Sequence, residues 1–149
     1  MPKEHIQAAV AVSLEPQQVI RFVSDIRNRS KYLQSLKSVS TIHGSPGVAT
    51  KSWNWKWEMM GHEFEGTGKT VAYEPGRLYA FVTEGGIVSR FTYQAEPENE
   101  GTRLSIDVDF DVPTEFADRD DLDGLLTITS VRAQDSALNL KQVMENAAN

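Results

Sequence analysis

The hydrophobic pattern of the chain repeats every second residue over most of its length, which is the period of β-strands. Residues 52–60 show this most clearly, because all three tryptophans of the chain and a methionine occupy alternate positions there, with polar residues between them. Side chains of a strand alternate between its two faces. The segment is therefore predicted to be a half-buried strand whose aromatic face consists of Trp53, Trp55, Trp57 and Met59.

The same alternation predicts further strands, and turn residues separate one from the next. These strands are expected at residues 6–14, 39–43, 62–73, 77–83, 87–95 and 104–112. Because the connections are short, consecutive strands should pair as an antiparallel meander. Residues 77–83 are apolar in both phases of the alternation, so the pattern does not decide which of their faces points inward.

Two short helices are expected after the first strand, and a long one at the C-terminus. The first short helix begins at Pro16, a residue that suits the first helical turn, and the second lies within 25–36. In the last 30 or so residues the apolar spacing changes to three or four, which predicts a helix of about 25 residues, nearly 40 Å long. Its apolar face would consist of Leu122, Leu126, Thr129, Ala133, Ala137, Leu140 and Met144.

The expected fold is α+β: a curved antiparallel sheet of about six to seven strands, covered by the long C-terminal helix. A sheet of that size must curl to cover its own apolar face, and the helix is long enough to cross it. The 149 residues suit one domain, 1–149, with one core.

Four local motifs, in this order of elements, resemble the SRPBCC or START-like superfamily, including its polyketide cyclase/dehydrase and lipid-transport family. They are the first helix at 15–25, the strand–turn–strand at 73–78, the start of the last strand at 101–104 and the helix end at 140–145. The resemblance implies a helix-grip fold with an elongated cavity between sheet and helix. It also implies apolar ligands such as lipids, polyketides or quinones, and in some members cyclisation or dehydration.

Whether the aromatic face fills the interior or lines a cavity is left open by the residues themselves. The middle of the long helix carries small side chains, which must either meet large ones or leave space. The resemblance favours the cavity. On that basis the candidate ligand-binding residues are Trp53, Trp55, Trp57, Met59, Phe64, Phe91, Tyr93, Leu126, Thr129, Ala133, Ala137 and Leu140.

No set of nucleophile, base and orienting residue can be assembled from the sequence. The candidates for an acid, a base or a carbonyl polariser are His62, Glu58, Tyr93 and Arg90. With three histidines and no cysteine, neither a metal site nor a cofactor is expected. Residues 66–70 contain the end of a phosphate-binding loop, but the pattern predicts a strand there, not the helix that such a loop requires.

Charge and hydropathy restrict the classes of partner that the chain is expected to have. A net charge of −6 and a pI near 5.0 argue against a nucleic-acid partner, and no apolar run is long enough to span a membrane. Residues 1–14 lack the apolar core of a signal peptide, so a cytoplasmic location is expected. Ile128, Val131 and Leu138 lie opposite the apolar face of the long helix, which makes a homodimer a further hypothesis.

Three functional hypotheses result. The leading one is binding, and in some cases transport, of a hydrophobic small molecule in an internal cavity. The first alternative is a cyclase or dehydratase reaction in the same cavity. The second alternative is a protein-binding accessory module.

Overall fold

The computed structural model describes residues 3–33, 36–44, 50–59, 61–113 and 119–147, and only the backbone of residues 3, 119–128 and 147. In this part of the chain the elements are β1 (Lys3–Val12), α1 (Pro16–Ser24), the 3-10 helix η1 (Ile26–Lys31), β2 (Leu36–His43), β3 (Ser52–Met59), β4 (His62–Glu74), β5 (Leu78–Gly85), β6 (Ser89–Glu98), β7 (Gly101–Asp111) and α2 (Arg119–Ala147).

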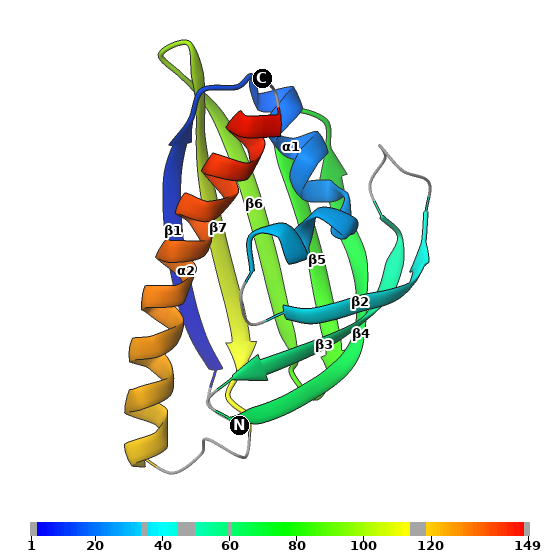
Figure 1. Ribbon diagram of the computed structural model, residues 1–149, viewed down its shortest axis with the longest axis vertical. Helices are drawn as coiled ribbons and strands as arrows, with labels where there is room; N and C mark the ends of the chain where they lie inside the picture. Colours follow the sequence, from blue (N-terminus) through cyan, green and yellow to red (C-terminus); the bar gives the residue numbers. More distant parts are fainter. Residues whose placement is uncertain (1–2, 34–35, 45–49, 60, 114–118, 148–149) are drawn as a thin grey trace.

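Within these residues the strands form one seven-stranded sheet of order β1-β7-β6-β5-β4-β3-β2, with every neighbouring pair antiparallel. β1 and β2 follow each other in sequence but lie at opposite edges, because α1 and η1 cross the sheet between them (Figure 1). Register shifts interrupt the β2–β3 and β4–β5 pairings. Irregularities of this kind bend strands and increase twist, which helps the sheet to curve.

The helices cover one side of this sheet. α1 contacts β5, β6 and β7, whereas α2 runs beside the edge strand β1 (Figure 1). Ala137, Leu140 and Met144 of α2 are buried, while Val131 and Leu138 are exposed on its opposite face, as the helical spacing predicts. The α+β fold of a curved antiparallel sheet with a long C-terminal helix is confirmed. The side chains of Leu122, Leu126 and Ile128, which belonged to the predicted faces, lie outside the described residues.

Local sequence explains where α1 and η1 begin. Pro16 opens α1, and the side-chain oxygen of Gln18 accepts the Glu15 N–H at 3.1 Å. Asp25 caps η1 by accepting the Arg27 N–H at 3.1 Å. The second short helix is therefore a 3-10 helix, and its three residues per turn place positions 26, 29 and 32 on one face.

The orientation of β5, which the pattern left open, is settled by burial. Tyr79, Phe81 and Thr83 are buried, and Phe81 and Thr83 line an interior cavity. The partly buried Val82 instead lines a second pocket, of about 240 Å³, together with residues such as Lys69 and Glu84. Ala80 is also buried, so both faces of β5 are covered where it begins, which is why both phases are apolar.

Candidate functional site

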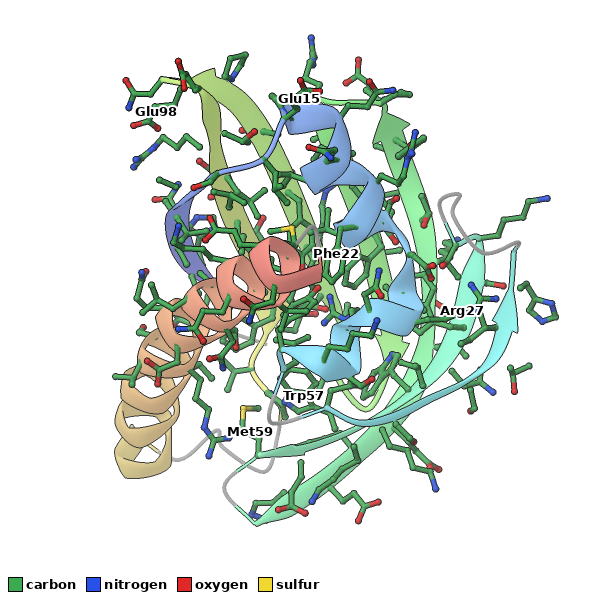
Figure 2. All side chains as sticks on the ribbon, turned by 45° about the horizontal axis from the view of Figure 1, so that its top comes forward. Glu15, Phe22, Arg27, Trp57, Met59 and Glu98 are labelled. Carbon is green, nitrogen blue, oxygen red and sulfur yellow. The ribbon has the colours of Figure 1, made fainter. Side chains whose placement is uncertain are left out.

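A cavity of about 160 Å³ lies between the inner face of the sheet, η1 and the middle of α2. Its walls are mostly aromatic and aliphatic side chains from β2, β3, β5, β6 and β7. Figure 2 shows Trp57 and Met59 of β3 on the side of the sheet that faces α2. On α2 the lining includes the partly buried Thr129, Ala133 and Ser136. The cavity therefore lies beside the part of the helix that carries these small side chains.

The β3 wall is held in place by glycines on the neighbouring strand. Trp53 pairs with Gly68 and Trp55 with Gly66 in the β3–β4 register. A β-carbon added at Gly68 would come within 2.5 Å of the Trp53 ring, and one at Gly66 within 2.7 Å of the Trp55 ring. The indoles therefore lie across the β4 backbone. This accounts for the Gly-Thr-Gly sequence without any phosphate-binding role.

The same wall is fixed by a hydrogen bond and by ring contacts. Trp55 Nε1 donates to the Thr67 carbonyl at 2.9 Å. The Trp53 ring meets Phe81 edge-on, with centroids 5.1 Å apart, and Phe81 stacks on Phe91 at 4.8 Å and 10°. These geometries are favourable for aromatic pairs. The tryptophans thus pack against the sheet and line the cavity at the same time.

The opposite wall contains a buried positive charge. Arg29 projects from η1, is only 5% exposed and lines the cavity. Its guanidinium carbon lies 4.6 Å from the ring centroid of Phe81 and 4.8 Å from that of Phe91. Arg29 Nη1 also donates a hydrogen bond of 3.1 Å to the hydroxyl of Tyr93. Both contacts are attractive for a guanidinium, which stays protonated in proteins.

Tyrosine hydroxyls gather beside this guanidinium. Burial raises the pKa of Tyr32 well above its usual range, and burial raises the pKa of Tyr79 to about 12. Both are therefore neutral at physiological pH. The Thr70 hydroxyl donates a hydrogen bond to the Thr50 carbonyl. The Tyr79 hydroxyl is therefore the donor in its 3.0 Å hydrogen bond to Thr70 Oγ1. The buried Tyr32 hydroxyl lies near that of Tyr93, but no group of the described residues is in hydrogen-bond geometry with it.

The structure brings most of the predicted ligand-binding residues to this cavity. Those that line it are Trp53, Trp55, Trp57, Met59, Phe91, Tyr93, Thr129 and Ala133. Phe64, Ala137 and Leu140 are buried in the core but do not line the cavity. The side chain of Leu126 lies outside the described residues.

The predicted acid–base candidates are spread over the molecule. Of His62, Glu58, Tyr93 and Arg90, only Tyr93 lines the cavity. Glu58 faces solvent and pairs with Lys37 at 3.2 Å, and His62 and Arg90 are exposed. The structure therefore does not bring these four together.

Sequence reasoning missed Arg29 and Tyr32. The segment 26–32 is rich in polar residues, which normally indicates a solvated helix. The signal was a spacing of three: Ile26, Arg29 and Tyr32 are all buried because a 3-10 helix aligns them. Reading the segment as an α-helix hides that alignment.

In the part of the chain that the structure describes, no group of three or more His, Cys, Asp or Glu residues could hold a metal ion. Over those same residues, no helix combines the length and apolar character that a membrane crossing needs.

Comparisons with known proteins agree with this architecture. The family model described as polyketide cyclase / dehydrase and lipid transport matches residues 3–145. A search of curated protein sequences finds no match.

Among solved structures, a Thermus thermophilus protein is similar with a TM-score of 0.82 and 17% identity, covering 98% of this chain and 100% of that one. A START superfamily protein from Mycobacterium smegmatis is similar with a TM-score of 0.75 and 13% identity, covering 96% and 98%. An aromatase/cyclase from Streptomyces sp. R1128 is similar with a TM-score of 0.74 and 14% identity, covering 99% and 97%. At such identities the likeness shows a shared fold.

Proposed function

The chain belongs to the polyketide cyclase / dehydrase and lipid transport family, and from this premise we propose that it binds a hydrophobic small molecule in the cavity between sheet and α2. The observation that carries the proposal is the aromatic lining formed by Trp53, Trp55, Phe81 and Phe91 around about 160 Å³ of space. Concave sites with apolar walls and a few polar groups are typical of small-molecule binding.

The size of the cavity indicates the size of the ligand. An apolar cavity of about 150 Å³ in another protein holds benzene. A space of about 160 Å³ therefore suits a body of one or two rings. Flat rings should gain most here, because Phe81, Phe91 and Trp53 supply aromatic side chains for them to pack against.

Saturable binding and a space-filling variant test this proposal together. We expect 2-naphthalenemethanol to quench the tryptophan fluorescence in a saturable way, since every tryptophan of the chain lines the cavity. Ala133→Leu adds a side chain to the α2 wall and should weaken this binding by about tenfold or more. Val131→Leu, on the exposed face of the same helix, is the matched control and should bind as the wild type does.

Equal affinity of Ala133→Leu and Val131→Leu for the probe would count against a site in the cavity. Native mass spectrometry of freshly purified protein, followed by extraction, would identify any compound that it carries. A mass shift that disappears in Ala133→Leu and persists in Val131→Leu is the expected result.

A cyclase or dehydratase reaction in the same cavity is the second candidate, and the buried cluster of Arg29, Tyr32 and Tyr93 favours it. A guanidinium beside a bound carbonyl stabilises negative charge on its oxygen, and a neutral phenol can donate a proton to it. The test is conversion of a linear β-polycarbonyl compound to a ring with loss of water, followed by ultraviolet absorbance. Turnover that Tyr93→Phe abolishes would support it, and an inactive wild type would rule it out for that substrate class.

A further inference from the structure

Arg29 is a buried cation for which the described residues supply no anion. Among the described residues the ion pairs join partners such as Arg27 and Asp25, and no carboxylate of those residues lies within ion-pair distance of Arg29. Burying a charge without a partner is costly. Two aromatic rings and the Tyr93 hydroxyl compensate only in part for the loss of hydration of the guanidinium, because none of them carries a negative charge.

The hydrogen-bond inventory around Arg29 has more donors than acceptors. One guanidinium N–H is used on the Tyr93 hydroxyl, and the remaining ones have no acceptor in the described part of the protein. Tyr32, which is 4% exposed, lines the same cavity, and its hydroxyl has no partner there either. Because Tyr32 stays protonated, it adds another donor. The group that is missing from this cluster is an acceptor, and beside a cation it is best an anion.

From these observations we propose that the cavity ligand is a hydrophobic carboxylic acid whose carboxylate binds the Arg29 guanidinium and accepts a hydrogen bond from Tyr32, while its ring system lies along Phe81, Phe91 and Trp53. The inference rests on the proposed function, of which it specifies the ligand class. A carboxylate matches the planar fork of an arginine with parallel hydrogen bonds, which a neutral carbonyl cannot do.

Four other polar residues of the lining are less suited to this role. Thr83 donates to the Ile87 carbonyl at 2.9 Å and lies 2.5 Å from the Ser89 hydroxyl, so this pair is occupied internally. Arg132 and Asp135 of α2 border the cavity but are exposed to solvent. Water screens charges there, whereas it is largely excluded around Arg29.

Calorimetric titration of a matched pair of probes tests the inference. We expect 2-naphthoate to bind the wild type about tenfold or more tightly than 2-naphthalenemethanol, which has the same rings but no charge. Arg29→Met should remove most of that preference, by weakening the binding of the acid far more than the binding of the alcohol. Arg29→Lys keeps the charge but not the fork, and should retain only part of the preference.

Tyr32→Phe provides a readout that does not depend on the folding of an Arg29 variant. It should weaken naphthoate binding by about threefold to tenfold while changing the unfolding temperature little, because among the described residues the hydroxyl that it removes has no partner in hydrogen-bond geometry. A merely structural tyrosine would lose stability and leave the preference for the acid intact.

The outcomes separate the two proposals. If the alcohol binds as tightly as the acid, the carboxylate inference is overturned while binding in the cavity stands. If neither probe binds saturably, both fall. If the acid is preferred but Arg29→Met keeps the preference, the carboxylate lies elsewhere and the assignment to Arg29 is overturned.

Discussion

The β3–β4 hairpin and η1 form two walls of one cavity, but they differ in how fully their side chains are packed and hydrogen-bonded. The inner face of the hairpin serves packing: indoles lie on glycines, the Trp55 N–H has its acceptor, and Trp53 meets Phe81 edge-on. In η1, a charged and a polar side chain are buried with part of their hydrogen-bonding capacity unused. The comparison suggests that the hairpin supplies stability and η1 supplies selectivity.

Trp53→Ala should break the hairpin wall most severely. The ring is 2% exposed, and its removal leaves a space next to Phe81, so we expect the free energy of unfolding to fall by about 3–5 kcal/mol. Trp57→Ala is the control, since Trp57 is only partly buried and should cost about half as much. Chemical denaturation measures both, and equal losses would contradict the assignment of Trp53 to the core.

Gly66→Ala tests the close approach on which this wall depends. Its β-carbon would lie 2.0 Å from the Glu84 carbonyl oxygen and 2.7 Å from the Trp55 ring, so backbone or ring must move. The expected loss is about 2–3 kcal/mol by denaturant unfolding. Thr67→Ala, an exposed neighbour on the same strand, should change stability by less than about 0.5 kcal/mol. A Gly66→Ala protein as stable as Thr67→Ala would be inconsistent with the close packing described.

Alkaline titration examines the tyrosines next to Arg29. The pKa of Tyr79 is raised to about 12, so its neutral form is favoured in the folded state. The resulting stability is fully present below the unfolded pKa of about 10 and is lost as the pH rises towards 12, by up to roughly 2 kcal/mol. Unfolding curves over this range should show the loss, and Tyr79→Phe should reduce it, leaving the part that comes from Tyr32. A flat wild-type profile would contradict the burial of the Tyr79 hydroxyl.

Arg29→Met tests whether η1 contributes to stability. It should lower the free energy of unfolding little, although Arg29 is among the most buried charged residues. Replacing an unpaired buried charge by an apolar side chain of similar length is often neutral or stabilising, so we expect a change within about 1 kcal/mol. Arg27→Met removes an ion pair of 3.2 Å to Asp25 and a hydrogen bond of 3.0 Å to the Gly44 carbonyl. It should be the more damaging of the two in thermal unfolding, and the reverse order would indicate that η1 is built for stability.

The two walls also differ in how far the sequence could predict them. The alternation at 52–60 identified the β3 face because a strand that is buried on one side repeats every two residues. The long helix and its small inner residues followed from spacing in the same way. Both signals are local and depend on a simple period.

The sequence pattern did not predict the η1 wall, because the burial of its side chains depends on the tertiary structure around them. Arg29 looks like a surface residue in sequence, and it is buried because the 3-10 turn directs it, together with Tyr32, towards β5 and β6. The orientation of β5 was equally hidden, since α1 covers the start of a strand that is apolar on both faces. The acid–base candidates were drawn from residue type alone, and three of the four point away from the cavity.

The order of strands has a consequence for biosynthesis. β1 pairs with β7, from Lys3 opposite Asp111 to Val12 opposite Thr102. Roughly a hundred further residues must therefore be synthesised before the first strand can pair with its neighbour. Contacts between such distant segments close slowly. A nascent chain could form the β3–β4 hairpin early, but the cavity would have no complete walls until β7 and α2 had left the ribosome.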